Sequence, residues 1–141
     1  MSPSNLIDVR GPRFSATVTA VVLATVLLTQ SAWLLFVQTA VFAIGATAGP
    51  NKSPYGRVYR KLIKPFLSSP KKFENVSPPK FAQLVGTFFA LVGLLGIALG
   101  LPAVFLAAVG AAFAAAFLNS VFGFCLGCQT YLLIKRLTPI Q

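Results

Sequence analysis

The chain has 141 residues, of which 56% are hydrophobic, and its mean hydropathy is +0.80. Twelve Lys and Arg accompany two acidic residues and no histidine, so the formal net charge is +10. This composition excludes carboxylate pairs, Ser-His-Asp triads and histidine metal sites within one chain. It predicts an integral membrane protein whose positive charge reflects membrane topology and not nucleic-acid binding.

The first apolar segment, residues 14–51, contains no ionisable side chain. One bilayer crossing needs about 20 helical residues, so the segment is too long for a single span. We predict a helical hairpin with spans at about 13–29 and 32–49, folded back at the polar triplet Thr29-Gln30-Ser31. A cleavable signal peptide over residues 1–31 is the alternative, but hydrophobicity resumes at once after the triplet.

A basic connection, residues 50–80, follows this hairpin. Between Pro54 and Pro65 its apolar residues recur with helical spacing, which predicts a short amphipathic helix in the membrane interface. The cations that fall between the apolar residues are Arg57, Arg60, Lys61 and Lys64. They either anchor the two hairpins on the lipid surface or offer a soluble partner a docking surface. Further prolines predict an extended linker over residues 65–80.

The second apolar segment, residues 81–134, has no ionisable side chain except its two cysteines and one tyrosine. We predict a second hairpin with spans at about 80–100 and 103–123, turning at Gly100-Leu101-Pro102 because proline cannot continue the preceding helix. Many glycines and alanines, including Gly96-xxx-Gly100, favour close helix contacts. Packing within the hairpin and a homodimer face are the two interpretations.

The expected fold class is therefore an all-α membrane protein with four transmembrane helices in one domain, residues 1–141. An even number of spans places both termini and the connection on one side, which holds all twelve cations and which the positive-inside rule assigns to the cytoplasm. The predicted parts are hairpin 1 (about 13–49), the basic connection (50–80), hairpin 2 (about 80–123) and a cytoplasmic-side segment with a C-terminal helix (124–141).

The two hairpins begin with similar sequences. Pro12-Arg13-Phe14 matches Pro79-Lys80-Phe81, and Leu27-Leu28 matches Leu94-Leu95, with Val18 and Val85 between them at the same offset of 67 residues. Because both copies start on the same side, the match predicts a parallel repeat about an axis along the membrane normal. Chance similarity is the competing explanation.

Both cysteines lie in the motif Cys125-Leu126-Gly127-Cys128. The fourth span reaches the cytoplasmic boundary near Gly123, so the thiols should lie at that surface, where a permanent disulfide is disfavoured by the reducing cytosol. We expect a helix break between Gly123 and Gly127. A new helix beginning near Cys125 would favour its thiolate, whereas a continuing helix would oppose it.

Three roles for the cysteine pair compete. In thiol–disulfide or persulfide exchange, Cys125 attacks and Cys128 resolves the mixed bond. In metal binding, a second subunit would have to supply two more thiolates; no other cofactor is predicted. In the third role, the pair only packs at a helix end. Asn119, which should face inward and hydrogen-bond a neighbouring helix, and the glycines Gly123 and Gly127 are the predicted supporting residues.

Four motifs together resemble the bacterial membrane family catalogued as domain of unknown function 4395. They are Asp8-x-Arg10-Gly11-Pro12-Arg13-Phe14, Gly49-Pro50 with Ser53-Pro54-Tyr55-Gly56, Pro78-Pro79-x-Phe81-Ala82-Gln83, and Asn119-x-x-Phe122-Gly123-x-Cys125-Leu126-Gly127-Cys128. The resemblance implies a small multi-pass protein of the bacterial inner membrane, often encoded beside thioredoxin-like or rhodanese-like proteins. The family name assigns no activity.

The leading hypothesis is thiol–disulfide or sulfane-sulfur exchange between the cysteine pair and a soluble thioredoxin-like or rhodanese-like partner. The partner would dock on the basic surface. The sequence does not decide whether this role is enzymatic. The main alternative is a non-catalytic accessory subunit of a larger membrane complex, and a small transporter is a third class that lacks the buried ion pair expected for coupled transport.

Overall fold

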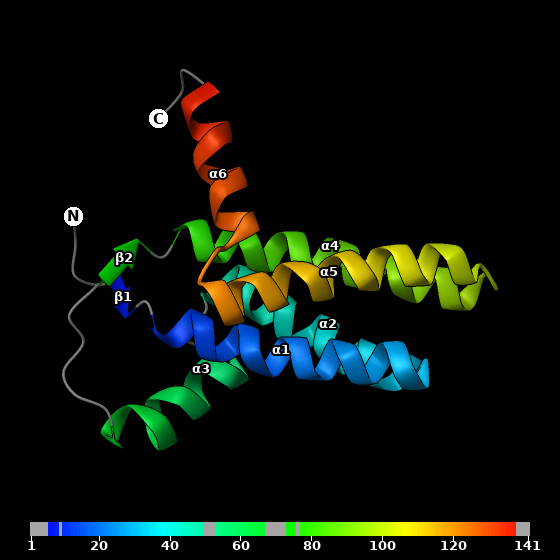
Figure 1. The fold of residues 1–141 in the computed structure, drawn as a ribbon, viewed down its shortest axis with the longest axis horizontal. Coiled ribbons are helices and arrows are strands. Elements are labelled where there is room, and N and C mark those ends of the chain that lie inside the picture. The colour runs from blue at the N-terminus through cyan, green and yellow to red at the C-terminus, as the bar shows by residue number, and fades with distance from the viewer. Residues whose placement is uncertain (1–5, 9, 50–52, 67–72, 76, 138–141) are drawn as a thin grey trace.

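The structure, a computed structural model, describes residues 6–8, 10–49, 53–66, 73–75 and 77–137. Its bundle consists of α1 (Arg10–Thr29), α2 (Ala32–Ala48), α4 (Ser77–Ala98) and α5 (Pro102–Phe122). The helix α2 packs along α4, α1 along α5, and α4 along α5. At the end of the bundle where α1 and α4 begin, α3 (Pro54–Val58) and α6 (Leu126–Leu137) turn away from its axis (Figure 1).

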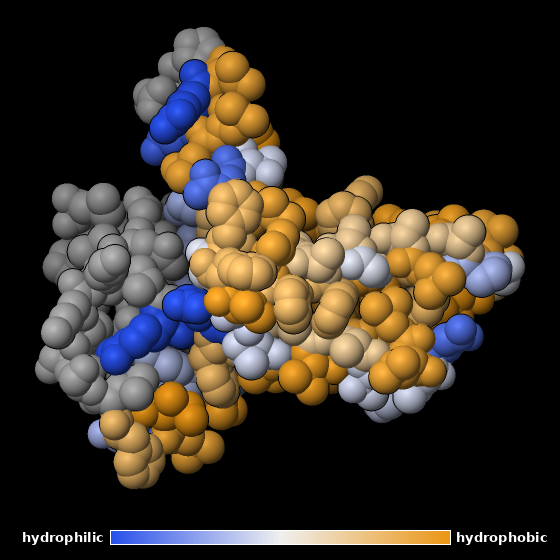
Figure 2. Space-filling view, viewed as in Figure 1, coloured by the Kyte–Doolittle hydropathy of each residue, from blue (hydrophilic) through white to orange (hydrophobic). Residues whose placement is uncertain are grey.

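The bundle helices have the composition of membrane spans. Arg10–Thr29, Pro78–Ala98 and Pro102–Phe122 are long and apolar enough to cross a bilayer, while α2 is a shorter apolar helix of 17 residues. Hydrophobic side chains cover much of the bundle surface as well as its interior (Figure 2). The interior cluster comprises Leu23, Val26, Leu35, Phe42, Ala90, Phe105, Val109 and Ala112. The predicted helical, membrane-like fold class is confirmed at this level.

Both predicted hairpin turns are confirmed. Gln30 adopts a positive φ of 56°, and the hydroxyl of Ser31 accepts a hydrogen bond from the Leu34 N–H at 3.2 Å, capping α2. In the second turn Gly100 has a φ of 70°, and Pro102 occupies the first position of α5, where its missing N–H costs nothing.

Glycines of α4 lie where neighbouring helices approach most closely. A Cβ added at Gly86 would meet the Phe42 ring of α2 at 2.8 Å, and one added at Gly96 would meet the backbone nitrogen of Phe105 in α5 at 2.8 Å. These contacts confirm the prediction that small residues serve packing within the chain.

The basic connection forms the predicted helix and ties it to the bundle. The Tyr59 ring is 3% exposed and lies 5.7 Å from the Phe14 ring of α1. The Tyr55 hydroxyl donates to the buried Gln38 Oε1 of α2 at 2.6 Å, and burial raises the pKa of Tyr55. Pro65 does not end the helical segment as predicted: α3 widens into a π-helical turn, Tyr59–Ile63, and closes in a 3-10 turn, Lys64–Phe66. Since the α-helical pattern has already changed before the proline, the proline does not interrupt an α-helical ladder.

The predicted linker is wrong at its end, and a strand pair was not predicted. The strands β1 (Leu6–Asp8) and β2 (Phe73–Asn75) pair antiparallel, and α4 already begins at Ser77. Pro78 and Pro79 are therefore in the first helical turn, where proline is tolerated because these N–H groups have no partner within the helix. Residues 67–72 and 76 lie outside the described part of the chain.

The strand pairing has the symmetry of the sequence repeat. Ile7 pairs with Glu74, which is 67 residues later, and the pairs on either side are Leu6 with Asn75 and Asp8 with Phe73. These pairs exchange under the same offset, as expected around a two-fold axis. The ring contact between Phe14 and Tyr59 has a counterpart of equal length, 5.7 Å, between Phe81 and Tyr131. Each hairpin is thus preceded by a strand and followed by a helix that packs on the hairpin's own first span.

Candidate functional site

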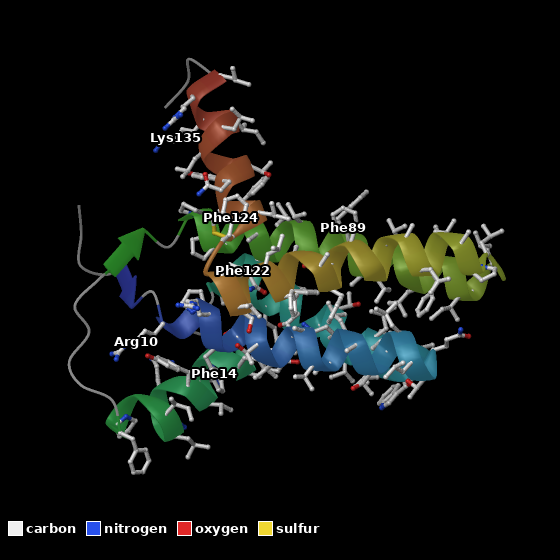
Figure 3. All side chains as sticks on the ribbon, in the orientation of Figure 1. Arg10, Phe14, Phe89, Phe122, Phe124 and Lys135 are labelled. Atoms are coloured by element: carbon white, nitrogen blue, oxygen red, sulfur yellow. A yellow bond between two sulfur atoms is a disulfide. The ribbon has the colours of Figure 1, made fainter. Side chains whose placement is uncertain are left out.

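The cysteine motif lies where α5 ends and α6 begins. The structure joins Cys125 and Cys128 by a disulfide, with a Cα–Cα distance of 5.1 Å (Figure 3). Both side chains are partly exposed. The predicted helix break is confirmed, because α5 stops at Phe122 and α6 starts at Leu126.

Gly123 produces this break. It adopts a left-handed conformation, φ 69° and ψ 15°, which glycine tolerates without strain. Its N–H donates to the Asn119 carbonyl at 3.0 Å, and the Phe124 N–H reaches back to the Leu118 carbonyl at 3.3 Å. This is the Schellman pattern of helix termination. Asn119 thus contributes its backbone carbonyl to the site.

Cys125 occupies the N-cap of α6. Its carbonyl accepts the first helical hydrogen bond, from the Gln129 N–H at 3.0 Å. Its sulfur lies 3.1 Å from the Cys128 backbone nitrogen, which donates to it. The sulfur of Cys125 therefore sits at the positive end of the helix dipole, with a backbone N–H directed at it.

Gly127 holds the start of α6 against the start of α4. A Cβ at this position would lie 2.6 Å from the Ala82 Cβ and 2.7 Å from the Ala82 Cα, a distance that no side-chain rotation can relieve. One turn further along, the Tyr131 ring packs on Phe81 of α4 at 5.7 Å. The glycine inside the cysteine motif thus fixes where the disulfide sits on the bundle.

Arg13 reaches the same end of α5 from α1. Its Nη2 donates to the Ser120 carbonyl at 3.2 Å, and a Cβ built at Gly123 would be 3.6 Å from its Cζ. The Ser120 hydroxyl is 2.7 Å from the Thr17 hydroxyl, so Ser120 makes the predicted interhelical hydrogen bond. The sequence gave no sign that Arg13 contacts α5, because the two segments are more than 100 residues apart. A cation at the C-terminal end of α5 also complements that helix dipole.

The basic surface of the connection lies on the other side of the bundle end. Arg57, Arg60 and Lys61 are exposed, and their segment packs on α1, whereas α6 packs on α4 (Figure 1). The side chain of Lys64 is outside the described part of the chain. The structure therefore does not bring the predicted docking cations next to the cysteines.

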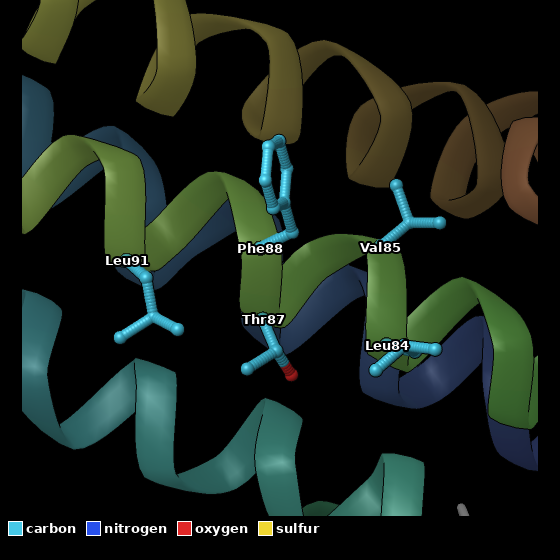
Figure 4. Close-up of a pocket in the computed structure, with 5 residues that line it drawn as sticks. All are labelled: Leu84, Val85, Thr87, Phe88 and Leu91. Carbon is cyan, nitrogen blue, oxygen red and sulfur yellow. The ribbon is translucent and has the colours of Figure 1, made fainter.

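A shallow groove on α4 begins one turn beyond Ala82. Its volume is about 380 Å³, and it is lined by Leu84, Val85, Thr87, Phe88 and Leu91 (Figure 4). The only hydroxyl in the lining, that of Thr87, donates to the Gln83 carbonyl at 2.8 Å. With its polar group already used and its leucines exposed, the groove has the character of a lipid-contacting surface.

Comparison with known families decides which family this is. Residues 7–136 match the family described as Domain of unknown function (DUF4395). The chain belongs to the DUF4395 family. The match includes the cysteine motif, the α4 entry and the α3 segment of this DUF4395 protein. No curated protein and no solved structure matches the chain.

Proposed function

We propose that the DUF4395 protein crosses the bacterial inner membrane four times, with both termini in the cytoplasm. The 17 residues of α2 give a length of about 25 Å, near the lower limit for a span. All described cations lie at the end of the bundle opposite the two hairpin turns, as the positive-inside rule requires of a cytoplasmic side. They are Arg10, Arg13, Arg57, Arg60, Lys61, Lys80, Lys135 and Arg136.

The proposed activity is thiol exchange by Cys125 and Cys128 with a soluble thioredoxin-like or rhodanese-like protein. The observation that supports it best is the partly exposed disulfide at the N-terminus of α6. After reduction, a Cys125 thiolate would accept the Cys128 N–H and face the helix dipole, which favours the ionised, nucleophilic form. The disulfide is then one state of a cycle and not a permanent staple.

The exchange balances with the partner as the other half of the couple. A partner thiolate attacks the Cys125 sulfur, the Cys125–Cys128 bond breaks, and Cys128 leaves as a thiolate that takes a proton. The partner's second thiol then attacks its own sulfur in the mixed disulfide, releasing Cys125. Two electrons and two protons reach the DUF4395 protein, and the partner becomes a disulfide; the reverse sequence oxidises the partner's dithiol form back.

A sulfane-sulfur donor would use the same two residues. The Cys125 thiolate takes the terminal sulfur of a partner persulfide, which leaves the partner as a thiolate and Cys125 as a persulfide. Attack by Cys128 on the Cys125 sulfur then releases hydrosulfide and forms the disulfide. A partner dithiol must reduce that disulfide before the next cycle.

The alternatives for the pair make different demands. Metal binding would need two further ligands from a second subunit, because no three His, Cys, Asp or Glu side chains gather among the described residues. An accessory subunit would use its small-residue faces for assembly. Gly86, Gly93 and Gly96 are instead in contact with α2 and α5 of the same chain, which favours the thiol function over the accessory one.

The trapping experiment uses a matched pair of variants. In Cys128→Ser, Cys125 forms a mixed disulfide that no resolving thiol can break, so an adduct should accumulate on a non-reducing gel and disappear with dithiothreitol. In Cys125→Ser, the attacking thiol is missing and the adduct should be absent. Mass spectrometry should identify a partner with its own reactive cysteine. An adduct-free Cys128→Ser membrane fraction, or equal adducts from both variants, would count against the mechanism.

A further inference from the structure

The helix α6 carries an apolar stripe that no element in the described part of the chain covers. Leu126, Leu133 and Leu137 lie seven and four residues apart, on one face of a helix with 3.6 residues per turn. Leu133 is 55% exposed and Leu137 is 75% exposed. In a soluble environment such a stripe would be costly, because each exposed leucine forgoes its burial energy.

The opposite face of α6 is cationic and includes the second cysteine. Lys135 follows Leu133 by two residues, about 200° around the helix, and Cys128 precedes Lys135 by seven residues, so the two share a face. Lys135 is exposed and Cys128 is partly exposed. The face opposite the leucine stripe thus combines positive charge with the disulfide.

The direction of α6 relates these two faces to the bundle. Figure 2 shows hydrophobic atoms on the side of α6 toward which the bundle extends, and hydrophilic atoms on the opposite side. Lys135 projects from that opposite side in Figure 3. Along α4, on which α6 packs, Leu84, Phe88 and Leu91 are also exposed. The leucine stripe and the outer surface of α4 therefore form one continuous apolar surface with a cationic edge.

The helix α3 occupies an equivalent place in the first hairpin. Ser53 caps α3 by accepting the Gly56 N–H, as Cys125 caps α6 by accepting the Cys128 N–H, at an offset of 72 residues for both atoms. Tyr59 and Tyr131 share this offset and make the two equal aromatic contacts described above. The predicted interfacial helix therefore has a structural counterpart that contains the cysteines.

We infer that α6 lies in the cytoplasmic headgroup layer of the bilayer, with its leucine stripe on the acyl chains and Lys135 and Arg136 toward lipid phosphates. This placement holds the disulfide at a fixed depth, on the face that a soluble protein can reach. Basic amphipathic helices bind anionic lipid surfaces in this way. The inference rests on the proposed topology but not on the proposed thiol chemistry.

The test places a single tryptophan on either face of α6 in the full-length protein. Trp33 is first replaced by Phe, which preserves its stacking on Phe36, and Leu133→Trp or Lys135→Trp is then added. Each protein is reconstituted in phosphatidylethanolamine and phosphatidylglycerol vesicles that contain lipids brominated at shallow or deep acyl positions. Leu133→Trp should emit at short wavelength and be quenched most by the shallow bromines, at a depth of about 5–10 Å. Lys135→Trp, its matched control, should be quenched much less by bromine and more by aqueous acrylamide.

Two results would overturn the inference. Long-wavelength emission from Leu133→Trp, quenched by acrylamide and not by bromolipids, would mean that α6 stands in the cytosol. Short-wavelength emission quenched by neither agent would mean that protein, such as a second copy of this chain, covers the stripe. Neither result bears on adduct formation by Cys128→Ser, so the failure of this inference and the failure of the thiol mechanism can be told apart.

Discussion

Adding one methyl group at Gly96 is expected to destabilise the bundle by about 1–3 kcal/mol, because overpacking forces backbone shifts. The new Cβ of Gly96→Ala would lie 2.8 Å from the Phe105 nitrogen and 3.2 Å from the Leu101 carbonyl oxygen. Both are backbone atoms, so α4 and α5 must separate beside their turn. Thermal unfolding in detergent, followed by circular dichroism, should show a lower midpoint than for the unchanged protein.

Gly110→Ala is the matched control in the facing helix. A Cβ at Gly110 meets no atom within 4 Å, so the same methyl group should be neutral or stabilise by about 0.5–1 kcal/mol, the usual gain over glycine in a helix. Equal midpoints for the two alanine variants would show that α4 and α5 do not approach as closely as described here.

Gly127→Ala is expected to detach the start of α6 from α4. The added methyl group would lie 2.6 Å from the Ala82 Cβ, and moving α6 away would also weaken the contact between Tyr131 and Phe81. A cost of about 1–3 kcal/mol for docking corresponds to roughly tenfold faster local opening. Hydrogen exchange measured by mass spectrometry should therefore accelerate across residues 126–137 by about that factor.

The Gly110→Ala variant serves again, because its α6 should exchange at the unchanged rate. A normal α6 exchange rate in Gly127→Ala would mean that glycine in the cysteine motif is not needed for docking on α4. The rate at which dithiothreitol reduces the disulfide is a second readout. It should rise in Gly127→Ala as the sulfurs lose the shelter of α4.

The spans and their turns could be predicted from the sequence because they follow from local chemistry. Segment length and the positions of Pro102 and the polar triplet at Gln30 decide where an apolar chain must turn. The break at Gly123 was predictable for the same reason, since a straight helix would overrun the bilayer. These features depend on short stretches of sequence and on the thickness of the membrane.

The remaining features depend on contacts between distant segments. The strands β1 and β2 have three residues each, too few for a periodic signal, and only the 67-residue repeat pointed to their pairing. The hydrogen bond from Arg13 to Ser120 requires the packing of α1 on α5, which no local pattern encodes. Hydrophobic spacing alone likewise could not place α3 and α6 on different sides of the bundle.

The most direct test of the account is the redox state of Cys125 and Cys128 in intact cells. Free thiols are alkylated with a mass tag before and after a brief pulse of oxidant or thiosulfate, with a variant that lacks both cysteines as the blank. The account predicts that the pair shifts between free and blocked forms during the pulse and recovers afterwards. A pair that stays in one state under every condition, whether free or blocked, would contradict a role in thiol or sulfur exchange.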